Sequence, residues 1–119
     1  MRFDRYTVTL LTLRPDAPVM TDAEAADLQD RHLAHGADLQ DQGLILARGP
    51  LTDQDDESLR GFCIWSIDQD AARVHASTDP AVQAGRLVVQ VMTWMMPAGN
   101  LLFEKVRVPR SVAEAMSDD

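Results

Sequence analysis

The sequence lacks the features that mark several common classes of protein. It contains one cysteine, Cys63, so no intrachain disulfide of the kind found in oxidising compartments can form. Lysine and arginine are few and scattered: 19 acidic residues against 11 basic ones give a formal net charge of −8. Because nucleic acids and anionic membrane surfaces are bound by clustered positive charge, we expect neither as a partner.

Long apolar runs and two familiar catalytic motifs are also missing. No stretch approaches the ~20 apolar residues that a membrane-spanning helix needs. The N-terminus carries Arg2, Asp4 and Arg5 and does not resemble a signal peptide, so we expect a cytoplasmic protein. There is no glycine-rich phosphate loop and no Gly-x-Ser-x-Gly motif, and we therefore expect neither a nucleotide cofactor nor serine hydrolysis.

The residues that are present fit one domain of 119 residues, 45% of them hydrophobic. Alternation of apolar and polar residues predicts strands, and a period of 3.6 residues predicts helices. The expected elements are a strand at 6–13, a helix from 22 to about 42, strands at 44–47 and 60–67, a helix at 69–77, a one-turn helix at 81–84 and a strand at 86–94. This β-α-β-β-α-β order favours an α+β, ferredoxin-like fold, with an antiparallel sheet and both helices on one face.

A C-terminal extension, residues 97–119, follows this domain, which we assign to residues 1–96. We expect the extension to form a further strand at 101–108 and a short helix at 112–116. The two main helices can cover only one face of the sheet, while the last strand of the domain is apolar on both faces. We therefore expect a homodimer through the sheet face, with the extension adding to the contact.

The first helix has a clear start, a clear end and an unusual inward face. Thr21 and Glu24 form a capping-box pattern at its start, and Gly43 is the expected glycine after its last turn. Its apolar stripe has a helical spacing and includes two histidines where leucine or alanine would be ordinary: Leu28, His32, His35 and Leu39.

Two blocks of the sequence carry a family resemblance. The first is His32-Leu-Ala-His35, eleven residues before Gly43 and followed by Leu-Ile-Leu-Ala-Arg-Gly49-Pro50. The second is Ser77-Thr-Asp79-Pro80-Ala-Val-Gln-Ala-Gly85, followed by a valine-rich strand that ends near Trp94. In this order and spacing, over residues 3–96, they resemble the YciI-like, or YCII-related, family.

The resemblance implies a dimeric α+β barrel, related in fold to muconolactone isomerases. It also implies a site built from a helix histidine and the aspartate of the Asp-Pro motif, which are His32 and Asp79 here. One characterised type in the family dechlorinates hydroxyquinols. The sequence departs from the family pattern at Gly36, where a larger apolar residue is usual, and in the length of its C-terminus, which would alter access to the cleft.

These residues predict acid–base chemistry. Imidazole, with an ordinary pKa of about 6.5, exchanges protons near neutral pH, and a carboxylate on one ring nitrogen fixes its tautomer. We expect His32 to act as general acid or base, oriented by Asp79, in an isomerisation or elimination on a small cyclic or aromatic substrate. The residues expected to line the substrate pocket are His35, Gly49, Pro50, Trp65 and Trp94.

Other interpretations of the same residues stay open. His32 could be a core histidine bonded to a backbone carbonyl, and Asp79 a simple helix cap. The cleft could then belong to a non-enzymatic module that binds a small ligand or a partner. His32 and His35 could also begin a metal site completed by His75 or Asp79, although we expect no metal.

Overall fold

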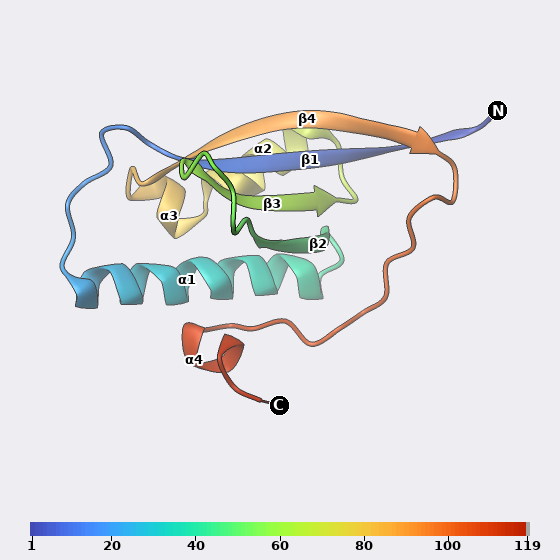
Figure 1. Ribbon diagram of the computed structural model, residues 1–119. Coiled ribbons are helices and arrows are strands. Elements are labelled where there is room, and N and C mark those ends of the chain that lie inside the picture. The colour runs from blue at the N-terminus through green and yellow to red at the C-terminus, as the bar shows by residue number, and fades with distance from the viewer. Residues whose placement is uncertain (119) are drawn as a thin grey trace.

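One antiparallel sheet organises the computed structural model, which describes residues 1–118. Its strands are β1 (Phe3–Leu13), β2 (Ile45–Pro50), β3 (Leu59–Trp65) and β4 (Leu87–Pro97). They lie in the order β2-β3-β1-β4, and every neighbouring pair is antiparallel (Figure 1). The ferredoxin-like α+β fold predicted from the order of elements is confirmed.

The helices are α1 (Asp22–Asp41), α2 (Gln69–Ser77), α3 (Pro80–Gln83) and α4 (Val112–Ala115). Helices α1 and α2 pack on the same face of the sheet, because residues of both join one core cluster with β2 and β3. The buried members of that cluster are Leu39, Ile45, Cys63, Trp65, Ala72 and Ala76. A second cluster around Leu28 and Ala81 ties α1 and α3 to the other end of the sheet.

Helix α1 is fixed at both ends as its sequence predicts. The amide of Glu24 donates to the Thr21 hydroxyl, and the amide of Thr21 donates to the Glu24 carboxylate, each at 3.1 Å. Gly43, with φ at 77°, adopts the left-handed conformation just after the helix. These anchors fix the position of His32 and His35, which lie on the middle turns of α1.

The other face of the sheet has no helix over it among the described residues. Strand β4 leaves three large apolar side chains on that face between 38% and 43% exposed, namely Val88, Met92 and Trp94. Their partners in register on β1 are Thr12, Val8 and Tyr6. Gln90 lies between Val88 and Met92 on the same face, so this part of the chain presents a largely apolar sheet surface with one polar residue in it.

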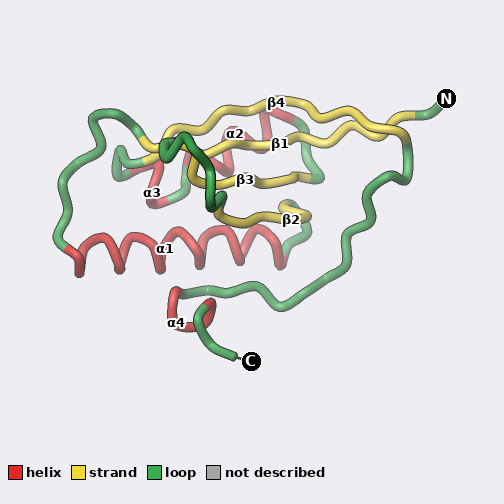
Figure 2. Tube along the Cα trace, viewed as in Figure 1, coloured by secondary structure: helices red, strands yellow, loops and turns green. Residues whose placement is uncertain are grey.

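The C-terminal segment differs from its prediction. The strand expected at 101–108 is absent, and residues 98–109 follow an irregular path from the end of β4 toward α1 (Figure 2). The backbone of this segment pairs with no sheet edge in the described chain, although its side chains alternate as in a strand. Helix α4 confirms the short helix expected there, and Arg110 attaches it to α1 through Asp38 and Asp41.

None of the helices in residues 1–118 combines the length and the apolar character required to cross a membrane.

Candidate active site

A large cavity of about 1310 Å³ lies between α1, β2, the start of α3 and the C-terminal segment. Helix α1 contributes one wall, β2 and β3 a second, and residues 102–109 a third. Six of the seven predicted site residues line it: His32, His35, Gly49, Pro50, Trp65 and Asp79. The cavity therefore gathers residues from segments that are far apart in sequence.

His32 and Asp79 are directly hydrogen-bonded although 47 residues separate them. Nδ1 of His32 lies 2.6 Å from Oδ2 of Asp79, and the side chains are 15% and 9% exposed. An ionised carboxylate only accepts hydrogen bonds, so the ring donates from Nδ1. The neutral ring then carries its lone pair on Nε2, for which residues 1–118 offer no hydrogen-bond partner.

The Asp-Pro sequence holds Asp79 in place for this contact. Asp79 is the N-cap of α3, and its Oδ1 accepts a hydrogen bond from the amide of Ala81 at 2.8 Å. Pro80 begins the helix, where its missing N–H costs nothing. One carboxylate oxygen therefore caps a helix while the other orients His32, so the cap and the orienting group are the same residue.

His35, one turn further along α1, makes a different contact. Its Nε2 lies 2.9 Å from the hydroxyl oxygen of Thr78, and that hydroxyl donates to the carbonyl of His75 at 2.8 Å. Since the single hydroxyl proton is used on the carbonyl, the oxygen accepts from His35 Nε2. His35 thus holds its proton on Nε2, opposite to the arrangement at His32.

The surroundings of His35 favour its neutral form. Burial lowers the pKa of His35 below the ordinary 6.5, and the positive charge of Arg48 lowers it further, while the carboxylates of Asp79 and Asp38 act in the opposite direction. His35 therefore serves near neutral pH as an uncharged donor to Thr78.

This shift predicts a dependence of stability on pH. Below pH 6.5 the unfolded chain protonates at position 35 before the folded protein does, so the free energy of unfolding falls as the pH decreases. H35Q keeps a donor toward Thr78 but cannot be protonated. Urea unfolding at a series of pH values should give a shallower decline for H35Q than for the wild type, with H75Q as control. Equal declines in H35Q and the wild type would contradict the assignment.

The remaining predicted pocket residues divide between the two faces of the sheet. Trp65 is buried on the helix-covered face, and its indole N–H donates to the hydroxyl of Thr9 at 2.8 Å. Trp94 does not line the cavity. It pairs with Tyr6, whereas the next pair along the strands, Thr7 and Thr93, faces the helices. Since successive side chains of a strand alternate between faces, Trp94 lies on the face that no helix covers, called the open face below.

Two residues at the site had no role in the prediction from sequence. Thr78 precedes the aspartate of the Asp-Pro motif and binds His35. Arg48, on β2, lines the cavity and donates to the carbonyl of Leu33 at 3.2 Å. The signal for Arg48 was a single charged residue in an otherwise apolar strand.

Neither a reactive thiol nor a metal centre emerges from the described residues. Burial raises the pKa of the Cys63 thiol, which keeps it protonated near neutral pH. No group of three or more histidine, cysteine, aspartate or glutamate side chains in residues 1–118 is arranged to hold a metal ion. His32 and His35 each bind a different partner on the loop before α3.

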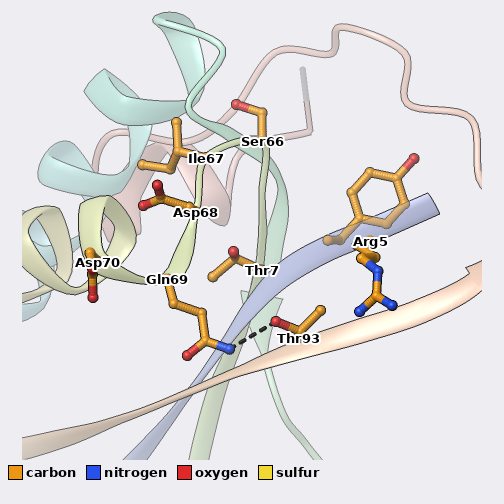
Figure 3. A pocket seen from close by; sticks show the side chains of 9 residues that line it. Arg5, Thr7, Ser66, Ile67, Asp68, Gln69, Asp70 and Thr93 are labelled. Carbon is orange, nitrogen blue, oxygen red and sulfur yellow. Dashed lines mark hydrogen bonds between the residues drawn. The ribbon is translucent and has the colours of Figure 1, made fainter.

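A second, more open cavity of about 520 Å³ lies at the N-terminal end of α2, near β1 and β4 (Figure 3). Some of its polar groups are engaged within the protein: Gln69 donates to Thr93 at 2.8 Å, and Asp68 accepts from the amide of Ala71 as the cap of α2. No histidine or cysteine is among its lining residues within the described chain. We therefore place the candidate active site in the larger cavity.

Comparisons with solved structures give distant similarities. One is 5-chloro-2-hydroxyhydroquinone dehydrochlorinase (TftG) from Burkholderia phenoliruptrix AC1100, in complex with 2,5-dihydroxybenzoquinone. It has 21% identity and a TM-score of 0.48, over 79% of this chain and 95% of that one. Another is SnoaB, a cofactor-independent oxygenase from Streptomyces nogalater, with 16% identity and a TM-score of 0.40, over 84% and 97% of the two chains. No curated protein matches the sequence.

A family match covers most of the chain. The family described as YCII-related domain matches residues 7–95, which include most of β1, all of α1, both site residues His32 and Asp79, and most of β4. The C-terminal segment lies outside the matched range. The resemblance read from the two sequence blocks is confirmed: the chain belongs to the YCII-related domain family.

Proposed function

We propose that the protein is a small enzyme that catalyses proton transfer on a small cyclic or aromatic substrate, with His32 as general base and acid. The observation that carries this proposal is the 2.6 Å hydrogen bond between His32 Nδ1 and Asp79 Oδ2 at the wall of a large cavity. The carboxylate selects the tautomer whose Nε2 is a free base, and it stabilises the imidazolium that forms when Nε2 accepts a proton.

The proton transfer leads to one of two outcomes. In an isomerisation, Nε2 removes a proton from a carbon beside a carbonyl group and returns it to a different carbon of the resulting enolate. In an elimination, Nε2 removes a proton from carbon or hydroxyl, the released electron pair forms a new double bond, and a leaving group such as chloride departs with its bonding pair. Both reactions need one base and neither needs an oxidant or reductant.

The walls of the cavity fit a ring-shaped substrate. Apolar side chains from α1, β2 and the core face the cavity together with the site histidines, including Leu28, Leu39, Ile45 and Trp65. The C-terminal segment contributes Leu102, Phe103 and Val106 from the opposite side. We propose that this segment forms a wall of the substrate site and, as the sequence led us to expect, adds to the contact between subunits.

Two assays test the proposal. The first measures chloride release from 5-chloro-2-hydroxyhydroquinone, the compound in the name of the Burkholderia enzyme, and so detects elimination. The second measures solvent deuterium entering the ring of 4-oxocyclohexanecarboxylate by NMR, and so detects exchange of a proton beside a carbonyl. We expect a rate above buffer, saturable in substrate, in at least one assay. Rates equal to buffer in both would contradict the proposal.

The alternative is a module that binds a small ligand in the same cavity without turnover. The two functions differ in what His32 does: the enzyme needs a free base on Nε2, whereas a module needs only a hydrogen-bond donor. Saturable binding of a probe with no proton exchange would favour the module. The enzyme is the better-supported reading because Asp79 orients the ring and the described residues leave Nε2 unpaired.

We also propose that a second copy of the chain covers the open face of the sheet. This face carries the exposed apolar side chains of Val88, Met92 and Trp94, and groups of large apolar side chains in globular proteins are normally buried. A two-fold axis would place the same patch of each subunit against the other.

The dimer gives a prediction about mass. Light scattering after gel filtration should show twice the chain mass for the wild type and for W94F. W94K places a charge in the centre of the contact and should give the mass of one chain, with an unchanged circular dichroism spectrum. A wild-type protein that is monomeric at tens of micromolar would contradict the dimer.

A further inference from the structure

Arg48 is a positive charge in the wall of the cavity that the proton transfer does not use. Its orientation depends on an irregularity in β2: Ile45 pairs with Trp65, but Ala47 pairs with Ile64, so one residue is extra between them. This bulge reverses the alternation of the strand. Arg48 consequently shares the helix-covered face with its partner Cys63 instead of facing the open side.

Helix α1 provides the space for this side chain at Gly36. The guanidinium of Arg48 lies against the helix there, so closely that a Cβ on residue 36 would overlap its Nη1 and Cζ atoms. Glycine inside a helix costs about 1 kcal/mol relative to alanine. Glycine at position 36 therefore makes helix α1 less stable than alanine would, and in exchange it leaves the space in which the Arg48 guanidinium lies.

Most N–H donors of the guanidinium make no hydrogen bond to the described residues. Its one hydrogen bond, from Nη1, goes to the carbonyl of Leu33, and no carboxylate in residues 1–118 forms an ion pair with it. A guanidinium has five N–H donors and stays charged at all accessible pH values. It also lies near enough to His35 to lower the pKa of that residue, which places its charge in the neighbourhood of His35.

The cavity as a whole has the opposite charge balance to the chain. Four arginines line it, Arg48, Arg60, Arg86 and Arg107, against two described carboxylates, Asp79 and Glu104. Both oxygens of Asp79 are already engaged, by His32 and by the amide of Ala81. A chain with a formal net charge of −8 thus encloses a positively charged cavity.

We propose that Arg48 binds the anionic group of the substrate, a carboxylate or an acidic ring oxygen, and so defines the substrate as a small cyclic organic anion. The placing of that anion relative to His32 rests on the proposed function, whereas the anion site itself does not. In the proton-transfer reaction the planar guanidinium holds the anionic group in two parallel hydrogen bonds. The ring of the substrate is thereby fixed with its reacting proton toward His32 Nε2.

The first test compares benzoate with benzamide, which has the same shape and no charge, by isothermal titration calorimetry at pH 7. Wild-type protein should bind benzoate and bind benzamide at least roughly 10-fold more weakly, the effect of one charge-assisted hydrogen-bonding pair. R48Q should weaken benzoate binding by roughly 10- to 100-fold. R73Q is the control, because Arg73 is an exposed arginine on α2 that does not line the cavity, and its affinity should stay near that of the wild type.

The second test uses the glycine. G36A should improve the helix and displace the guanidinium, so benzoate binding should fall about as far as in R48Q. The double variant G36A/R48Q should bind no more weakly than either single variant, because both remove one interaction. Wild-type affinity in G36A would refute the role of Gly36.

The outcomes separate this inference from the proposed function. Benzoate and benzamide bound equally, neither bound, or benzoate affinity unchanged in R48Q would each overturn the anion site, even if His32 proves essential for turnover. If R48Q loses benzoate while wild-type protein shows no turnover in either assay, the anion site stands and the proposed function fails.

Discussion

Replacing His32 with asparagine should reduce turnover by roughly 10²- to 10⁴-fold, the usual contribution of a general base. The asparagine amide nitrogen occupies the place of Nδ1 and can still donate to Asp79, so the buried carboxylate keeps its partner. What the variant lacks is any basic atom in the place of Nε2. The loss should therefore appear in kcat, with the fold and the binding of benzoate unchanged.

Two comparisons make this prediction specific to the base. H75N removes a histidine that does not line the cavity and should retain wild-type turnover. H32Q places an amide near the position of Nε2 and leaves Asp79 without its donor, so it should lose turnover and some stability as well. Turnover in H32N equal to the wild type, measured in whichever assay the wild-type enzyme supports, would remove His32 from the mechanism.

Much of the fold was predictable because the signals that define it are local. The capping box at Thr21 and the glycine Gly43 after the helix each depend on a few neighbouring residues, and both occur in the structure. The order of the elements then predicted the ferredoxin-like sheet, because few strand arrangements are compatible with a β-α-β-β-α-β chain whose neighbouring strands are antiparallel. The strand ends moved by only a few residues.

The prediction failed where structure depends on a distant partner. Residues 101–108 alternate like a strand, but a strand also needs a neighbouring edge to pair with, and their path leads away from the sheet. The position of Arg48 at the site was not predicted for a related reason. The face on which it lies is set by a bulge against β3, and its space is made by a glycine on α1, neither of which a strand pattern reveals.

The candidate site was predictable in its residue types and not in its geometry. A histidine on the inward stripe of α1 and an aspartate before a helix-starting proline are each common for structural reasons. Only packing of α1 against α3 brings them within hydrogen-bond distance. Trp94 shows what residue type alone cannot predict. An aromatic side chain is suitable for lining a pocket, but the register of β4 against β1 places this one on the face of the sheet that no helix covers.

The contact of Asp79 with His32 leads to the second large effect, which is expected from D79N. The oxygen of the asparagine can still accept from the amide of Ala81 and cap α3. Its NH₂ group, however, now faces Nδ1 of His32, and two donors cannot bond each other. The ring must move its proton to Nε2, which abolishes the free base, and turnover should fall by roughly 10²- to 10⁴-fold.

Nitrogen-15 NMR of the imidazole distinguishes this mechanism from a general loss of structure. Wild-type protein should show neutral His32 protonated on Nδ1, and D79N should show it protonated on Nε2, while benzoate still binds because Arg48 is untouched. D79A removes the cap as well as the carboxylate, so it should lose turnover together with about 1 kcal/mol of stability. A D79N enzyme that keeps both the Nδ1 proton and wild-type turnover would show that the aspartate is a helix cap alone. The distinction matters because the same carboxylate performs both tasks through different oxygens, and only the asparagine variant changes one of them while preserving the other.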